Sequence, residues 1–237
     1  MMINAQELSN SFDTILNSYA SSIPYGEQAS KREIVLDEYE KSVFLTRAQE
    51  DVIVSLYSGK NHLGESFETT EELRRYLEVL VKDKVYTNSD AEHITAVSQK
   101  SLIFKLPEDV LFITFEQVKY NSNCETIKYS TVYPVRQDEY TKIKNNPFRG
   151  TNKYRVLRLD RGNNYVEIIP YQEISEYQIK YLSKPAPIIL EDLGSLRIDG
   201  VSTKTTDFPL HPFVYKLILD RAVLMALQSK GISVENS

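Results

Sequence analysis

The chain has 237 residues, with 28 Lys and Arg against 33 Asp and Glu, and its formal net charge is −5. It contains one Cys, three His and no Trp. A single Cys excludes a disulfide framework and a multi-cysteine zinc or iron–sulfur site, and three scattered His argue against a multi-histidine metal site. The acidic balance argues against nucleic-acid binding over the whole surface. The 16 Tyr favour a protein that makes extensive contacts, because Tyr is enriched in interfaces.

Charge divides unevenly along the chain. Residues 1–100 hold 17 acids and 10 bases, whereas residues 101–237 hold 16 acids and 18 bases. Polar residues interrupt the first 16 positions, so they do not read as a signal peptide. The longest apolar run is far short of the ~20 residues of a transmembrane helix. The sequence therefore predicts a protein that is assembled in a reducing cytoplasm and has no membrane anchor.

The first third of the chain has the periodicity of helices. Apolar residues recur at helical spacing in residues 4–19, and a second helix is predicted over residues 31–57, about 40 Å long at 1.5 Å per residue. A third helix is predicted over residues 71–83, after a cap at Thr69 or Thr70. The apolar face predicted for the long helix consists of Val35, Tyr39, Val43, Ile53 and Tyr57.

From Lys84 onward the composition changes to β-branched and aromatic residues, which is typical of strands. Residues 154–159 and 165–170 flank Asp-Arg-Gly-Asn-Asn at 160–164, and Gly and Asn tolerate the positive φ of a tight turn, so a hairpin is predicted there. Residues 120–125 predict another turn, and residues 188–206 a loop region. The remaining strands are predicted at residues 85–86, 102–106, 110–120, 126–135 and 177–182, with a short helix or turn at 138–144.

Residues 210–230 return to helix, with Pro212 suited to the first helical position and Gly231 to the C-terminal cap. The apolar side chains of this helix spread almost all round it, so we expect it to be buried on every side, with the N-terminal helices as its cover. The predicted fold class is α+β: a helical bundle of the N-terminal helices and the C-terminal helix, with an inserted antiparallel β-rich region. The predicted domains are 1–100 completed by 210–230, and 101–209.

The sequence offers no positive argument for catalysis. Gly59-Lys60 lacks the earlier Gly and the preceding strand of a phosphate-binding loop. Cys124 lies in a polar turn without a base to deprotonate it, and His62 lies in a polar loop. His211, just before Pro212, is expected to form a local hydrogen bond rather than bind a ligand. We therefore predict no enzyme activity, no cofactor and no metal site.

Two features are candidates for an interface. The first is a basic stretch from residue 136 to 161, which carries eight bases against three acids and reads either as a solvated sheet face or as a surface for an acidic partner or passing DNA. The second is an aromatic residue and a small residue on the charged side of the long helix. Their position there is either due to chance or indicates that they pack on a neighbouring subunit. The candidate residues are Arg136, Lys142, Lys144, Arg149, Lys153, Arg155, Arg158, Arg161, Phe44 and Ala48.

A series of short motifs follows a fixed order along the second half of the chain. The series begins with Leu-Pro-Glu-Asp-Val at 106–110 and continues with Val-Arg-Gln-Asp-Glu-Tyr at 135–140, Asn-Asn-Pro-Phe at 145–148 and Tyr-Arg-Val-Leu at 154–157. Later come residues 177–185 and Leu-His-Pro at 210–212. The series resembles the head-to-tail adaptor proteins of tailed bacteriophages. The most similar types are the tail tubular protein A of short-tailed phages and the connector ring proteins of crAss-like phages. Residues 37–42, at the start of the long helix, also resemble the latter. The shared order, over roughly residues 31–230, carries the resemblance.

The resemblance implies a non-enzymatic virion protein, assembled in the host cytoplasm, that forms a ring, usually of twelve copies. Such a ring lies between the portal protein and the tail, contacts other connector or tail proteins, and surrounds the channel through which DNA passes. A cyclic ring requires a heterologous interface, in which two different faces of each copy meet. The alternatives are another virion role, such as a tail-tube or stopper protein, a soluble binding module unrelated to virions, and a nuclease built on carboxylates.

Overall fold

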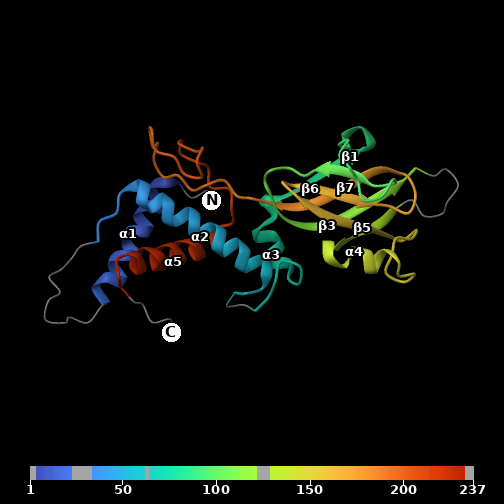
Figure 1. The fold of residues 1–237 in the computed structure, drawn as a ribbon. Coiled ribbons are helices and arrows are strands. Elements are labelled where there is room, and N and C mark those ends of the chain that lie inside the picture. Colours follow the sequence, from blue (N-terminus) through green and yellow to red (C-terminus); the bar gives the residue numbers. More distant parts are fainter. Residues whose placement is uncertain (1–3, 23–33, 62–63, 122–128, 233–237) are drawn as a thin grey trace. The chain divides into compact units, whose positions relative to one another are not determined.

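The computed structural model describes residues 4–22, 34–61, 64–121 and 129–232 (Figure 1). His62, Cys124 and most of the turn predicted at 120–125 lie outside these residues. The chain forms two compact units: a helical unit of Met1–Val79 with Pro185–Ser237, and a sheet unit of Leu80–Lys184. The protein is therefore of the α+β class. That the two regions are separate folding domains stays a prediction.

In its described residues the helical unit contains four α-helices, and the last of them, α5, packs against both α1 and α2. In Figure 1 these three helices, drawn blue and red, lie side by side although they come from opposite ends of the chain. The fully buried side chains Phe12, Ile53 and Ile218 contribute to its core. The helices are α1 (Ala5–Ser22), α2 (Glu38–Ser58), α3 (Glu71–Tyr76) and α5 (Pro212–Ser229), and a 3-10 turn, η1 (Glu78–Leu80), follows α3.

Helix α2 begins at Glu38, later than the sequence predicted. The Glu40 amide donates to Asp37 Oδ1 at 2.7 Å, and the Asp37 amide donates to Glu40 Oε2 at 3.3 Å. This capping box satisfies backbone donors that a longer helix would have paired internally. Gly59, at φ 77°, ends the helix as predicted. The helix has 21 residues and is about 32 Å long, so the prediction was wrong for residues 34–37, while residues 31–33 lie outside the described residues.

The buried face of α2 agrees with the predicted one at Ile53, which is fully buried, but differs from it elsewhere. Val35 is 76% exposed and lies outside the helix, while Leu45, Ala48 and Leu56 are fully buried. The reason is a segment from the far end of the chain: the Leu190 amide donates to Ser42 Oγ at 3.1 Å, and the Ile188 amide donates to Thr46 Oγ1 at 3.1 Å. The helix thus packs against this segment as well as α5, which periodicity alone does not show.

Helix α5 is amphipathic rather than buried on every side. Val214, Ile218 and Val223 are among its fully buried residues, as expected for a helix covered by α1 and α2. Its exposed strip includes Arg221, which pairs with Asp51 of α2 at 2.9 Å, so the prediction of complete burial was wrong for this face. The exposed residues of the strip are Lys216, Asp220, Arg221 and Gln228.

The start of α5 follows the sequence closely. Pro212 occupies its first turn, where its missing amide hydrogen costs nothing. His211 Nδ1 accepts a hydrogen bond from the Phe213 amide at 3.3 Å, which confirms the predicted local role of this histidine. The ring of Tyr76 stacks on His211 and Phe213, with centroid distances of 4.5 and 4.9 Å, and so joins α3 to the start of α5.

The sheet unit is built on one seven-stranded sheet in the order β1-β7-β3-β4-β5-β6-β2. Of its six neighbouring pairs, only β4 and β5 are parallel, so the expected antiparallel region is in fact a mixed sheet. The two strands can be parallel because α4 and the loop after it carry the chain back to the end of the sheet at which β4 began. The elements are β1 (Val81–Thr87), η2 (Asn88–Asp90), β2 (Leu102–Lys105), β3 (Val110–Tyr120), β4 (Tyr129–Val135), α4 (Gln137–Lys144), β5 (Arg155–Gly162), β6 (Tyr165–Ile169) and β7 (Ile174–Ser183).

Strand β1 replaces the second half of the third predicted helix. Every residue from Val81 to Thr87 pairs with β7, so the helix predicted to reach residue 83 was wrong beyond Tyr76. All of these residues except Tyr86 are exposed, and such a polar edge strand has little hydrophobic pattern of its own. Pairing with a strand about 100 residues away decided its conformation.

The sheet curls so that its two edge strands meet through aromatic side chains. Tyr86 of β1 lies 5.2 Å from Phe104 of β2 and 5.7 Å from Tyr177 of β7, measured between ring centroids. The Tyr86 hydroxyl also donates to the Lys105 carbonyl at 2.9 Å. Burial raises the pKa of Tyr86 far above its usual range. The concave side of the curled sheet therefore encloses an aromatic core.

The hairpin predicted around residues 160–164 is confirmed. Strands β5 and β6 pair in antiparallel register, with Gly162 opposite Tyr165. Asn163 and Asn164 have φ values of 50° and 61°, the positive values that a two-residue hairpin turn requires and that Asn tolerates.

Candidate interaction surface of the sheet unit

The basic stretch at 136–161 runs from the end of β4 through α4 and a loop to the end of β5. Helix α4 lies on the convex side of the sheet (Figure 1). Its Tyr140 packs on Leu157, Leu159 and Ile169. The eight predicted basic residues differ in their partners and in their burial. Some pair with carboxylates of the same chain, and others do not.

Arg158 is an internal residue rather than a surface cation. Its side chain is only 11% exposed, and Nη1 lies 2.6 Å from Oε2 of Glu116, which is 7% exposed. The hydroxyl of Tyr177 donates to the other oxygen of Glu116. Burial acts to lower the pKa of Arg158, but the charges of Glu116 and Asp160 outweigh it and raise that pKa. A buried carboxylate is therefore neutralised and hydrogen-bonded on both oxygens.

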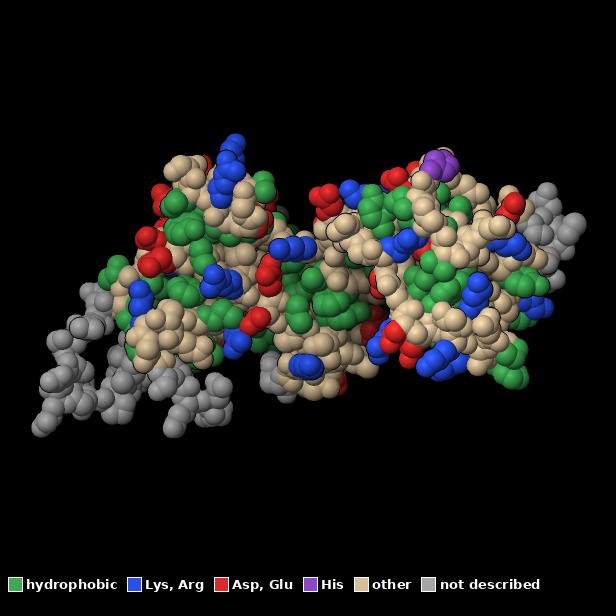
Figure 2. All heavy atoms as spheres, viewed as in Figure 1, with side chains coloured by type: hydrophobic (Ala, Val, Ile, Leu, Met, Phe, Trp, Pro, Cys, Tyr) green, Lys and Arg blue, Asp and Glu red, His purple; other side chains and the backbone are tan. Residues whose placement is uncertain are grey.

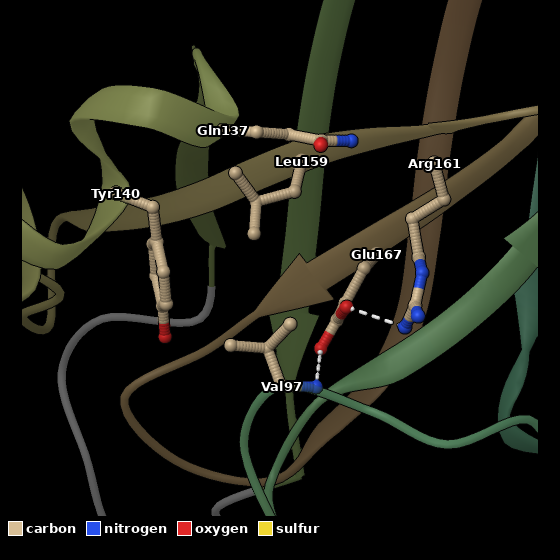
Figure 3. A pocket seen from close by; sticks show the side chains of 6 residues that line it. All are labelled: Val97, Gln137, Tyr140, Leu159, Arg161 and Glu167. Carbon is tan, nitrogen blue, oxygen red and sulfur yellow. Dashed lines mark hydrogen bonds and ion pairs between the residues drawn. The ribbon is translucent and has the colours of Figure 1, made fainter.

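Arg161 serves a second buried carboxylate, Glu167, which is fully buried (Figure 3). Arg161 Nη1 donates to Glu167 Oε2 at 2.9 Å and to the Thr95 carbonyl at 2.7 Å, while the Val97 amide donates to Glu167 Oε1 at 2.7 Å. Val97, Arg161 and Glu167 line a cavity of about 250 Å³ together with Tyr140. A carboxylate that is engaged on both oxygens is not poised to act as a base. The cavity thus has the character of a structural polar cluster.

Arg136 and Arg155 are also held by their own chain. Arg136 forms a two-pronged ion pair with Asp138, with distances of 3.1 and 2.9 Å. The Arg155 guanidinium lies 4.6 Å from the centre of the Tyr133 ring and donates to the Phe148 carbonyl at 3.0 Å. Arg155 therefore ties β5 to β4 and to the loop before β5.

The other four predicted bases have no carboxylate partner among the described residues. Lys142, Lys144, Arg149 and Lys153 are all exposed and fall within twelve residues of one another. Two aromatic side chains lie among them, Phe148 at 85% exposed and Tyr154 at 60%. Figure 2 shows basic and hydrophobic side chains beside one another on the sheet unit. We call the set Lys142, Lys144, Phe148, Arg149, Lys153 and Tyr154 the Phe148 surface.

The loop that carries the Phe148 surface is braced by hydrogen bonds to the side chain and the carbonyl of Asn146. Asn146 Oδ1 accepts from the Phe148 amide at 2.9 Å and from the Arg149 amide at 3.1 Å. The Gly150 amide donates to the Asn146 carbonyl at 2.8 Å, and a Cβ at Gly150 would lie 2.8 Å from that same oxygen. The loop therefore presents Phe148 outward without needing to fold when a partner arrives.

The helical candidates Phe44 and Ala48 do not share one surface. Ala48 is fully buried inside its own unit, whereas Phe44 is partly exposed. Sequence reasoning missed a buried cation on the same helix, Lys41, whose Nζ lies 2.7 Å from Asp13 and 2.9 Å from Glu38. Burial acts to lower its pKa, but hydrogen bonds from Lys41 to these carboxylates raise it on balance. Lys41 follows several acidic residues in the sequence, and this pattern is also typical of an exposed helix face, so it did not indicate that the side chain is buried.

Within the described residues, no group of three or more His, Cys, Asp or Glu could hold a metal ion. No helix of the described part is long and apolar enough to cross a membrane. What the geometry does provide is a rigid, basic and aromatic surface. Such a surface is suited to contact with another macromolecule rather than to the transformation of a small one.

Comparison with known proteins places the whole chain in one family. Residues 2–237 match the family model described as phage tail ring protein 3/4. The chain is 42% identical over 230 residues to Ring protein 3 of Bacteroides phage crAss001, covering 95% of each chain. It is 30% identical over 235 residues to Ring protein 4/5 of the same phage, covering 94% of this chain and 92% of that protein. The chain therefore belongs to the phage tail ring protein 3/4 family, as its motif order indicated.

Proposed function

We propose that this protein is a structural subunit of a phage virion that assembles into a ring between the portal and the tail and surrounds the DNA exit channel. The observation that carries the proposal is similarity over nearly the full length to a protein named as a ring protein, at 42% identity with 95% of both chains covered.

The physical character of the chain supports a role in contact rather than catalysis. The buried carboxylates of the sheet unit are neutralised by Arg158 and Arg161. The net charge of −5 also suits a DNA conduit, because an acidic wall repels phosphates and lets DNA move. The partners proposed are further copies of the chain, twelve in the arrangement that the resemblance implies, the portal protein and neighbouring tail proteins.

The proposal includes an architecture in which the N-terminal helices and α5 form one bundle and the β-rich region is an insertion within it. The packing of α5 on α1 and α2 supports this arrangement, since it brings both ends of the chain into the helical unit. Limited proteolysis tests it. Cleavage near residues 79 and 184 that releases a stable sheet fragment is expected, whereas scattered cleavage through the sheet unit would contradict it.

The ring is tested with the purified full-length chain. Native mass spectrometry and negative-stain electron microscopy are expected to show a closed ring, alone or in the presence of portal particles. A protein that stays monomeric at all concentrations and never joins portal particles would contradict the proposal. Co-purification with empty heads that lack tails separates an adaptor next to the portal from a tail-tube or stopper protein, which would stay with the tail.

A further inference from the structure

The two units carry opposite formal charges. The helical unit has 20 acidic and 12 basic residues, a net charge of −8, whereas the sheet unit has 13 acidic and 16 basic residues, a net charge of +3. The buried ion pairs described above cancel internally. The surface charge available to a partner therefore comes from residues without such pairs, and on the sheet unit these are concentrated at the Phe148 surface.

The helical unit offers a matching surface of opposite sign. Residues 65–72 contain Glu65, Glu68, Glu71 and Glu72 and no Lys or Arg, and all four carboxylates are exposed. We call these four residues the acidic segment. Glu71 pairs with Arg75 at 2.7 Å, but both side chains remain more than 70% exposed. Glu65, Glu68 and Glu72 have no basic partner among the described residues. The acidic segment thus holds four carboxylates in eight residues. The Phe148 surface holds four cations in twelve residues, a comparable density of the opposite charge.

We propose that the Phe148 surface of one copy docks on the acidic segment of the neighbouring copy in the ring. The inference rests on the proposed ring function and adds the faces that meet. A contact between two different surfaces of the same chain is heterologous, and it leaves one of each surface open until the ring closes. Phe148 is the anchor of the contact, because an aromatic side chain at 85% exposure on a pre-formed loop loses little freedom on binding.

A neighbouring copy fits this surface better than passing DNA does. Duplex DNA would engage the four cations through its phosphates, but a phosphate backbone gives no apolar surface to cover Phe148 and Tyr154. A protein partner covers both the charges and the rings, and interfaces are typically rich in aromatic side chains together with Arg. The acidic segment supplies the charges that such a partner needs.

The experiment uses charge reversal in the full-length chain. The variant Arg149→Glu/Lys153→Glu lowers the net charge of the Phe148 surface from +4 to 0, and the variant Glu65→Lys/Glu68→Lys raises that of the acidic segment from −4 to 0. In each variant alone, every contact of the ring joins a surface without net charge to a charged one, so the net attraction is lost and the reversed side chains face like charges. Each is therefore expected to raise the protein concentration needed for half-assembly by more than about tenfold, measured by sedimentation velocity and native mass spectrometry.

An equimolar mixture of the two variants distinguishes a specific contact from general repulsion. In a ring that alternates the two variants, one contact places the glutamates introduced at positions 149 and 153 against the lysines introduced at positions 65 and 68, and the next contact joins the unaltered Phe148 surface to the unaltered acidic segment. Rings of one-to-one composition are therefore expected from the mixture. The quadruple variant, with all four reversals in one chain, is expected to assemble alone. Failure of both the mixture and the quadruple variant to assemble would overturn the proposed contact.

Matched controls change the same number of charges elsewhere. Lys84→Glu/Lys100→Glu on the sheet unit and Glu191→Lys/Asp207→Lys on the helical unit alter exposed residues outside both surfaces and should assemble as the wild type does. Circular dichroism and thermal melting show whether each variant is folded. Phe148→Ala gives an uncharged test: assembly should weaken while the melting temperature stays unchanged. Unimpaired assembly of both Phe148→Ala and the Arg149 variant would overturn the proposal.

Two further outcomes separate the alternatives. If the wild-type chain forms no rings at all, the proposed ring function fails and the contact fails with it. If the wild type and the Arg149 variant both form rings, but the variant loses salt-sensitive binding to a duplex DNA fragment, the Phe148 surface faces DNA and the proposed contact is wrong. Loss of assembly that the mixture restores supports the contact between copies.

Discussion

The helical unit and the sheet unit both bury ion pairs, but they bury them in opposite ways. In the helical unit a single cation, Lys41, is buried at 5% side-chain exposure, and its partners Asp13 and Glu38 still reach solvent at 43% and 33%. In the sheet unit the carboxylates are the buried members, with Glu116 at 7% and Glu167 at 0%. Breaking an ion pair therefore costs more stability when the charged group that remains is buried and cannot rehydrate. The predictions below test that difference.

The largest effect is expected in the sheet unit for Arg158→Ala. Removal of the guanidinium leaves Glu116 buried without its cation, so we expect a loss of about 3–5 kcal/mol in the free energy of unfolding. Urea denaturation measures the loss. The double variant Arg158→Met/Glu116→Leu removes both charges and should recover much of it. A single variant as stable as the wild type would show that the pair is not needed.

A smaller effect is expected in the helical unit for Lys41→Met. The two carboxylates that remain can turn toward water, so we expect a loss of about 1–3 kcal/mol. The same urea experiment gives the value, with Lys216→Met on the exposed strip of α5 as the control, for which a change within about 0.5 kcal/mol is expected. A loss as large as that of Arg158→Ala would remove the contrast between the units.

The cap of α5 tests a neutral interaction beside these charged ones. His211→Ala removes the acceptor for the Phe213 amide and the ring that stacks on Tyr76, and we expect a loss of about 1 kcal/mol. His211→Asn keeps an acceptor at the cap and should recover part of this loss. Thermal melting compares the two variants. Equal melting temperatures for His211→Ala and the wild type would show that Pro212 and packing are enough to start the helix.

The smallest effect concerns pH and the exposed pair of Lys82 and Asp109 in the sheet unit, whose charged atoms are 2.6 Å apart. The hydrogen bond from Lys82 lowers the pKa of Asp109 below its ordinary value of 3.8. The carboxylate therefore stabilises the folded state above about pH 4, and this contribution is lost as the pH falls through the lowered pKa. The stability difference between the wild type and Asp109→Asn should be constant near neutral pH and shrink below pH 4 in acid titrations. A difference that grows in acid would contradict the assignment.

Much of the fold could be predicted because local chemistry decided it. Strand β3 begins and ends at the predicted residues, and the hairpin at Asn163–Asn164 follows from residues that tolerate positive φ. Helix α5 begins at Pro212 and is followed by Gly231 at φ 78°, for similar local reasons. The family resemblance also came from sequence, because motif order survives substitution within each motif.

Two of the errors share one physical cause, which is pairing between distant segments. Strand β1 exists because β7 pairs with it, and the buried face of α2 was set by residues 188–190. The basic stretch shows the same limit. Its composition placed eight cations together, but the sequence could not show that Glu116, 42 residues away from Arg158, neutralises one of them.

The sequence alone predicted the α+β class, the two ends of α5, the hairpin turn and the family, since these depend on turn residues, caps and motif order that act over a few positions. The tertiary structure alone decided which charges are free. The net charge of −5 said only that the chain is mildly acidic. Folding pairs Arg158 and Arg161 with buried carboxylates and leaves Lys142, Lys144, Arg149 and Lys153 around an exposed Phe148, because burial of a carboxylate demands a cation and the sheet brings one within reach.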